Sequence, residues 1–148
     1  MIQQLTPTQP QVRPVQPPTG SKISLFLPNL DGGGAERVFV HLAEGFVAKG
    51  YPVDLVLAQA EGPYLAKVPS TINVVDLQSR SPVIVSKTLK LKTYLQQTCP
   101  DVLLTTLDIF NAAAWAKRLA QVSTPVVMVV QTNLTQQFRD RHSPLVHW

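Results

Sequence analysis

Short apolar runs alternate with amphipathic segments along most of the chain. Runs of strand length, bounded by turn-forming residues, occupy 22–27, 53–58, 72–77, 101–106 and 125–131. Apolar side chains recur at the 3.6-residue period of a helix over 35–47, 84–97 and 112–119. Residues 61–69 show neither pattern and predict a loop with room for one helical turn. Strands that alternate with helices predict an α/β fold class.

The helical pattern that begins at Ala35 is the clearest in the chain. Its first turn holds Glu36 and its last turn holds Lys49, charges that suit the two ends of the helix dipole. Gly50 follows, and glycine readily adopts the left-handed conformation that ends many helices. We therefore expect this helix to end at Gly50.

Almost uninterrupted apolar strands are typical of a parallel sheet that helices cover on both faces. Right-handed crossovers then favour a Rossmann-like, doubly wound parallel sheet of about five strands in the order 3-2-1-4-5. In that order the direction of winding reverses between strands 1 and 4, and ligands bind there, outside the carboxyl ends of the strands. The loops 29–34 and 107–111 flank this crevice. Topology alone therefore selects them as candidate binding loops.

The beginning of the chain differs in composition from the rest. Five of the 13 prolines and five glutamines lie within residues 1–21, where Arg13 is the only charged side chain before Lys22. Such a segment cannot bury enough apolar area to offset its conformational entropy. We expect 1–21 to be a disordered tail, 22–134 to be one Rossmann-like domain, and 135–148 to be a C-terminal segment.

Several classes of protein lack support in this sequence. The N-terminus has no basic segment followed by an apolar stretch, and no apolar run approaches membrane-spanning length, so we expect a cytoplasmic protein. The single cysteine, Cys99, excludes an internal disulfide and a cysteine-based metal cluster, and we expect it to be a small buried side chain. The scattered histidines predict no metal site, and we expect no cofactor.

The net charge of +4 comes from 13 basic and nine acidic residues, and the excess is local. Arg80, Lys87, Lys90 and Lys92 equal this excess, and they lie between Asp76 and Asp101, a stretch without an acidic residue. Such a helix face is either simply solvated or a contact for phosphate, an anionic membrane surface or nucleic acid. Because no stacking aromatics are interleaved with the lysines, nucleic acid is the least supported partner.

Three successive glycines, Gly32, Gly33 and Gly34, stand between the first strand and the first helix. A glycine loop at a helix N-terminus can hold a phosphate with its backbone N–H groups. The residues that follow are not Lys-Ser/Thr, so the loop is no ATPase P-loop, and the dinucleotide fingerprint is matched in its first half only. A phosphate cradle and a tight turn that binds nothing both remain open.

Charged residues accompany the two candidate loops. Arg37 lies in the first turn of the helix, where the dipole disfavours a cation, so it pairs with Glu36 or Asp31 or reaches a ligand anion. Asp31 and Asp108 are the carboxylates expected near the crevice, as an acid/base pair or as contacts to a substrate. For Asp108 we expect a helix cap, because its side chain precedes the next helix.

The stretch from Lys22 to Gln59, which reads KISLFLPNLDGGGAERVFVHLAEGFVAKGYPVDLVLAQ, resembles the beginning of family 4 glycosyltransferases. These are retaining, nucleotide-sugar-dependent enzymes of the GT-B fold. The resemblance continues more weakly to about residue 134. It implies that the chain is the N-terminal, acceptor-side domain of such an enzyme, which transfers a hexose to a glycan or to a lipid-linked acceptor.

The resemblance also assigns roles to residues. It implies that Gly32, Gly33 and Gly34 bind the donor phosphate, with Arg37 as a further contact. Many family members have His-Asn after the fifth strand, whereas this chain has Gln131-Thr132-Asn133. Gln131 and Asn133 are therefore the candidates for sugar or acceptor contacts there, beside Asp31 and Asp108.

A complete family member has a second domain that binds the nucleotide and the diphosphate. The sequence ends at Trp148, so we expect a truncated chain that is inactive alone and has a separate donor-binding domain or chain as its partner. The resemblance also favours an anionic membrane surface as a partner, contacted by Lys87, Lys90 and Lys92. The alternative is a non-catalytic module that kept the fold and an anion site. A third hypothesis is another nucleotide-binding Rossmann-like protein.

Overall fold

A computed structural model describes residues 20–79 and 83–130 of the chain. Five strands, three α-helices and two short 3-10 helices make up this part. In chain order they are β1 (Ile23–Leu27), α1 (Gly34–Ala48), β2 (Val53–Leu57), η1 (Leu65–Lys67), β3 (Asn73–Asp76), α2 (Ile84–Thr98), β4 (Val102–Thr106), η2 (Leu107–Ile109), α3 (Phe110–Ala120) and β5 (Val126–Val129). All eight strands and helices expected from periodicity are present, with bounds that differ by a residue or two at most ends.

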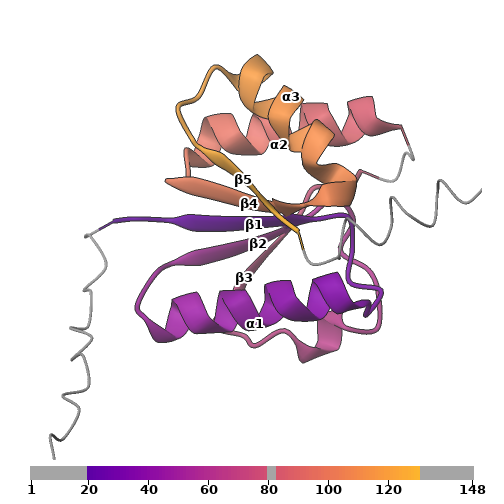
Figure 1. Ribbon diagram of the computed structural model, residues 1–148, viewed down its shortest axis with the longest axis vertical. Helices are drawn as coiled ribbons and strands as arrows, with labels where there is room; N and C mark the ends of the chain where they lie inside the picture. Colours follow the sequence, from indigo (N-terminus) through magenta and orange to yellow (C-terminus); the bar gives the residue numbers. More distant parts are fainter. Residues whose placement is uncertain (1–19, 80–82, 131–148) are drawn as a thin grey trace, which may run out of the picture.

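The strands form one parallel sheet in the order β3-β2-β1-β4-β5 (Figure 1). The expected order 3-2-1-4-5 is therefore confirmed. β1 is the central strand, and its residue Phe26 is aligned with Val56 of β2 and with Thr105 of β4. The fold is an α/β fold of the Rossmann-like type.

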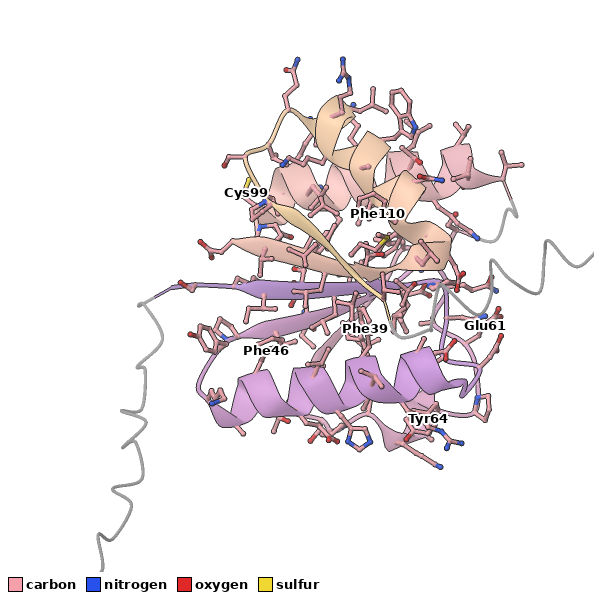
Figure 2. The ribbon with its side chains drawn as sticks, in the orientation of Figure 1. Phe39, Phe46, Glu61, Tyr64, Cys99 and Phe110 are labelled. Atoms are coloured by element: carbon pink, nitrogen blue, oxygen red, sulfur yellow. The ribbon has the colours of Figure 1, made fainter. Side chains whose placement is uncertain are left out.

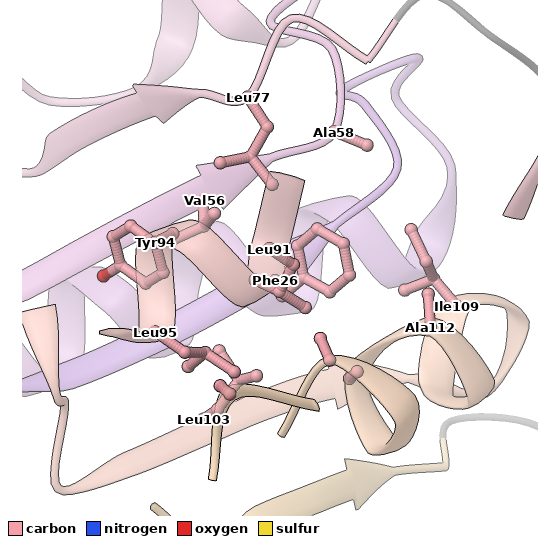
Figure 3. Packing of buried hydrophobic residues seen from close by; sticks show 13 residues of the cluster. Phe26, Val56, Ala58, Leu77, Leu91, Tyr94, Leu95, Leu103, Ile109 and Ala112 are labelled. Atoms are coloured by element: carbon pink, nitrogen blue, oxygen red, sulfur yellow. The ribbon is translucent and has the colours of Figure 1, made fainter. Parts of the chain in front are cut away.

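The helices cover the sheet unequally, since α1 lies on one face and α2 and α3 lie together on the other (Figure 1). Successive strand residues point to opposite faces. Leu25 and Leu55 accordingly pack in the cluster beneath α1. Phe26 and Val56 pack in the cluster beneath α2 and α3, where they meet Leu91 (Figure 3). Burial on both faces explains why the strands are apolar at nearly every position.

The end of α1 agrees with the sequence pattern. Gly50 has a φ of 85°, in the left-handed region. Its N–H donates to the carbonyl of Val47, and the N–H of Tyr51 donates to the carbonyl of Phe46. These two bonds form the Schellman motif, which satisfies carbonyls that the helix itself leaves unpaired.

Two local expectations are wrong. Asp108 does not cap α3, because residues 107–109 form η2 and shift the helix boundary to Ile109, where no side chain makes a capping hydrogen bond. Cys99 is exposed rather than buried, because it ends α2 in a left-handed conformation with a φ of 43°. The expected tail lies outside the described residues except for residues 20 and 21, and so does the C-terminal segment 135–148.

Candidate functional site

The loops that follow β1 and β4 meet at the carboxyl edge of the sheet. β1 and β4 are neighbours, yet their connections run to opposite faces, since α1 follows β1 on one face and α3 follows β4 on the other. This divergence is the switch point at which doubly wound folds bind ligands. The glycine loop lies on one side of it, and Thr106 with η2 lies on the other.

A second loop holds the glycine loop in place. The N–H of Leu30 donates to the carbonyl of Glu61 at 2.9 Å, and the N–H of Tyr64 donates to the carbonyl of Leu30 at 3.1 Å. Gly62 lies between these contacts with a φ of 111°, and a Cβ there would collide with the Leu30 carbonyl. Figure 2 shows Glu61 and Tyr64 at the end of the molecule where α1 begins. The sequence pattern did not single out Gly62, whose close backbone contact only the fold reveals.

The N-terminus of α1 follows Gly33, whose backbone is extended, and no side chain of the described residues caps this end of the helix. The first backbone N–H groups of a helix have no partner within the helix. Among residues 20–79 and 83–130, a Cβ on Gly34 would meet nothing within 4 Å, so they leave this side of the loop open. A Cβ on Gly33 would lie 2.6 Å from Oε2 of Glu36. The Glu36 carboxylate therefore folds back against the glycine loop, where the helix dipole favours a negative charge.

Arg37 does not form either ion pair expected from its position. Within the described residues its guanidinium lies over the ring of Tyr64, 5.7 Å from the ring centroid. The ammonium group of Lys67 lies 4.8 Å from the same centroid. Tyr64 also packs against the apolar cluster beneath α1, and its Cδ2 lies 3.8 Å from the place of a Cβ on Gly32. Two cations therefore gather on one aromatic ring directly beside the glycine loop.

The two candidate carboxylates are held differently. Asp31 is exposed and accepts a hydrogen bond of 2.8 Å from the side-chain amide of Asn29. Asp108 is exposed on η2, on the far side of the switch point. Asp31 therefore belongs to the glycine loop, whereas Asp108 belongs to the loop after β4.

Two buried hydroxyls lie at the carboxyl end of β4. Thr105 is fully buried and Thr106 is 4% exposed. Neither Oγ1 atom has a hydrogen-bond partner within the part of the chain that the structure describes. A buried hydroxyl without a partner costs free energy, and such exceptions gather where water or a ligand supplies the bond. Sequence patterning gave no signal for these two residues.

The other candidate residues lie apart from the glycine loop. Lys87, Lys90 and Lys92 are on α2, on the sheet face opposite α1. Gln131 and Asn133 lie outside the described residues. The structure thus brings together Gly32–Gly34, Asp31 and Arg37, and leaves the lysines on a separate surface.

A buried charged network lies near the amino ends of β1, β2 and β3, at the other end of the strands from the glycine loop. Asp54 is 3% exposed. Its carboxylate accepts hydrogen bonds from Tyr94 at 2.6 Å and from Asn73 at 2.8 Å. Lys22 Nζ lies 2.7 Å from the same carboxylate, and Ser24 Oγ lies 2.7 Å from the Tyr94 hydroxyl. Burial by itself raises the pKa of Asp54, but the hydrogen bonds and the Lys22 charge outweigh it and lower that pKa. Burial and the bond to Asp54 raise the pKa of Tyr94.

Within residues 20–79 and 83–130, no three residues among His, Cys, Asp and Glu come together as metal ligands would. In the same ranges, no helix is long and apolar enough to cross a membrane. The glycine loop and its neighbouring cations lie at the switch point of the sheet and form the candidate site.

A family model described as Glycosyltransferase Family 4 matches residues 32–148. No curated protein matches the chain. Among solved structures, the chain is similar to a glycosyltransferase from Rickettsia africae ESF-5, with a TM-score of 0.54 and 18% sequence identity. The similarity covers 80% of this chain and 33% of that one, so the chain spans about a third of its length. This likeness shows the shared fold.

Proposed function

Because the chain belongs to glycosyltransferase family 4, we propose that it is the acceptor-side domain of a retaining, nucleotide-sugar-dependent enzyme. In this proposal the complete enzyme acts in the cytoplasm and transfers a hexose to a glycan or to a lipid-linked acceptor. The observation that carries the proposal is the position of the glycine loop, at the switch point of the sheet and at a helix N-terminus that no side chain of the described residues caps.

The proposed role of the glycine loop follows from the charge that develops during transfer. As the bond between sugar and diphosphate breaks, negative charge grows on the departing phosphate oxygens, and groups that stabilise this charge lower the barrier. The N–H groups at Gly33 and Gly34 are fixed dipoles suited to such an oxygen. Arg37 adds a positive charge in the first turn of the same helix.

The glycine loop alone supplies few groups for a diphosphate and should bind one only weakly. Glu36 brings a carboxylate against the loop, and Arg37 is engaged with Tyr64. We therefore propose that a separate domain or chain binds the nucleotide and most of the diphosphate, and that the 148 residues alone transfer no sugar. Gln131 and Asn133 are proposed to contact the sugar or the acceptor, together with Asp31 and Asp108.

Backbone NMR would test the proposed site directly. UDP-glucose, GDP-mannose and inorganic pyrophosphate are added in turn to the labelled chain, and shifts of the Gly32–Gly34 amides are expected. Gly34→Val places bulk in the open space at the loop and should abolish these shifts. Gly45→Val is the matched control, because Gly45 also lies in α1 with nothing within 4 Å of its Cβ position. A loop that responds to none of the three probes would contradict the proposal.

Turnover of a nucleotide sugar tests whether transfer requires a separate donor-binding domain. The chain alone should release no nucleotide, and addition of the donor-binding domain of a family 4 enzyme should restore transfer. Product anomers measured by NMR then report whether the configuration is retained. Pyrophosphate binding at the loop without transfer in the reconstituted system would instead support a non-catalytic anion-binding module.

A further inference from the structure

Thr106 is the last residue of β4, and its hydroxyl is buried without a partner among the described residues. Only 4% of the residue is exposed. A hydroxyl that loses water on folding and gains no hydrogen bond destabilises the folded chain. Valine would fill nearly the same space without this cost. The hydroxyl therefore calls for a role other than the stability of the fold.

The register of the sheet places Thr106 beside the start of the glycine loop. Because Phe26 is aligned with Thr105, Thr106 comes level with Leu27, the last residue of β1. On its other side Thr106 is aligned with Val129 of β5, which packs in the cluster beneath α1. Aligned residues of neighbouring strands point to the same face of a sheet. The Thr106 hydroxyl thus faces the side on which α1 begins, one strand away from the glycine loop.

The surroundings of Thr106 favour an uncharged partner. The cluster beneath α1 is apolar. Asp54 is the one charged residue that is buried within residues 20–79 and 83–130, and it lies near the amino end of β2. Those residues therefore supply no buried cation to neutralise an anion at Thr106. A neutral hydroxyl on a ligand suits the position better, because it can both donate to Oγ1 and accept from it.

We propose that Thr106 Oγ1 binds a sugar hydroxyl, either on the hexose of the donor or on a sugar of the acceptor. The proposal rests on the proposed function, since it adds a contact for the sugar to the site whose glycine loop holds the phosphate. A buried group that is left unpaired when a ligand lacks the matching hydroxyl discriminates against that ligand. Thr106 is therefore a residue that determines which sugar the site accepts.

Thr106→Val tests the proposal, and Thr105→Val is the matched control. Thr105 is also buried with an unpartnered hydroxyl among the described residues, but it is aligned with Phe26 and shares the face of α2 and α3. Each variant should be at least as stable as the parent chain in thermal unfolding, because each loses a buried hydroxyl without a partner. Only Thr106→Val should lower the affinity for sugars. Thr106→Ser keeps the hydroxyl and should retain most of that affinity.

Backbone NMR titrations of the labelled chain measure the affinities. In the donor arm, UDP-glucose is compared with UDP, and GDP-mannose with GDP. In the acceptor arm, the probes are methyl α-glucoside, methyl α-mannoside and N-acetylglucosamine. Thr106→Val should weaken the sugar-bearing probes of one arm roughly fivefold, the loss of one neutral hydrogen bond, and should leave UDP, GDP and pyrophosphate unchanged. The arm that responds identifies the source of the sugar.

Deoxy derivatives of the responding probe locate the hydroxyl that Thr106 contacts. Removal of the matching hydroxyl should weaken binding to the parent chain roughly fivefold. The same removal should leave binding to Thr106→Val unchanged, because the contact is already lost. Coupling of this kind between a ligand group and a side chain is expected for groups in contact.

Three outcomes would overturn the proposal. The first is that Thr106→Val weakens no sugar-bearing probe, as expected if a buried water alone pairs with the hydroxyl. The second is an equal loss of sugar affinity in Thr105→Val. The third is a loss of stability in Thr106→Val, which would mean that the hydroxyl already has a partner in the free chain.

Pyrophosphate separates this proposal from the proposed function. If the Gly32–Gly34 amides respond to pyrophosphate while Thr106→Val weakens no sugar, the proposed phosphate site stands and the role of Thr106 is wrong. If sugars bind through Thr106 while the loop amides respond to no phosphate, the role of Thr106 stands and the proposed phosphate site is wrong.

Discussion

The hydroxyl of Tyr94 on α2 donates a hydrogen bond of 2.6 Å to the carboxylate of Asp54 on β2, inside the layer between sheet and helices. Asn73 on β3 donates to the same carboxylate, and Ser24 on β1 meets the Tyr94 hydroxyl. In the sheet register, Ser24 is aligned with Asp54 and Asp54 with Asn73. One charged group therefore links three strands and a helix. A shift of β2 by one residue would turn Asp54 to the other face and break every bond of this network.

Tyr94→Phe is expected to lower the free energy of unfolding by about 1.5–3 kcal/mol, the range for a buried hydrogen bond to a charged group. The variant keeps the ring in the apolar cluster but deprives Asp54 of one donor. Urea denaturation followed by circular dichroism measures the loss. Ser24→Ala should cost less, because it leaves the Tyr94–Asp54 bond in place. If Tyr94→Phe is as stable as the parent chain, the network does not stabilise the fold.

Asp54 should make the fold sensitive to acid. Its pKa in the folded state lies below the ordinary value of 3.8, so between the two values the unfolded chain binds more protons than the folded chain. The contribution of Asp54 to stability is therefore complete above about pH 4 and is lost as the pH falls through the folded-state pKa. Asp54→Asn removes this titration.

The free energy of unfolding at a series of pH values between neutrality and pH 2 checks this dependence. The parent chain should lose stability more steeply below about pH 4 than Asp54→Asn does. Equal slopes for the two proteins would contradict the assignment of an ionised Asp54 in the folded chain. Asp31→Asn, at an exposed carboxylate outside the network, is the control.

Much of this fold is predictable from the sequence because its determinants are local. Apolar runs and helical stripes predict the strands and helices, and Gly50 marks the end of α1 by its left-handed preference. Contacts between distant segments leave no such mark. The sequence does not reveal that Gly62 supports the loop at Leu30, or that Tyr64 draws Arg37 away from both nearby carboxylates.

Asp54 is a second example of contacts that the sequence does not predict. A charged residue inside an otherwise apolar strand gives no sign of its partners, because Lys22, Asn73 and Tyr94 come from three other segments. The sequence pattern therefore predicts a candidate site but not the interactions around it.

Gly62→Ala should destabilise the chain by about 1–3 kcal/mol and disturb the glycine loop. Its φ of 111° disfavours any residue with a Cβ, and the added methyl group would collide with the Leu30 carbonyl. Thermal unfolding measures the loss, and NMR shifts at Gly32–Gly34 report the change in the loop. Gly45→Ala, in an open helical position, should instead be neutral or slightly stabilising. Unchanged loop amides in Gly62→Ala would show that this contact does not position the loop.

Arg37→Ala should weaken binding of pyrophosphate to the chain roughly fivefold, since it removes one positive charge beside the loop in a well-hydrated setting. Arg37→Lys keeps the charge and should retain most of the affinity. Isothermal titration calorimetry at low salt measures both. If affinity is unchanged in Arg37→Ala, the guanidinium serves only its contact with Tyr64 and has no part in the site.

Glu36→Gln should have the opposite effect. The Glu36 carboxylate folds against Gly33, so it occupies the surroundings of the helix N-terminus that the proposed site offers to a phosphate. A bound anion and this carboxylate repel each other, and removal of the negative charge should strengthen pyrophosphate binding roughly fivefold. Glu44→Gln provides the control, because Glu44 lies on the same helix and pairs with His41 at 3.5 Å. A gain in affinity for Glu36→Gln alone would place the anion at the start of α1. Equal affinities of both variants and the parent chain would indicate that the anion binds elsewhere.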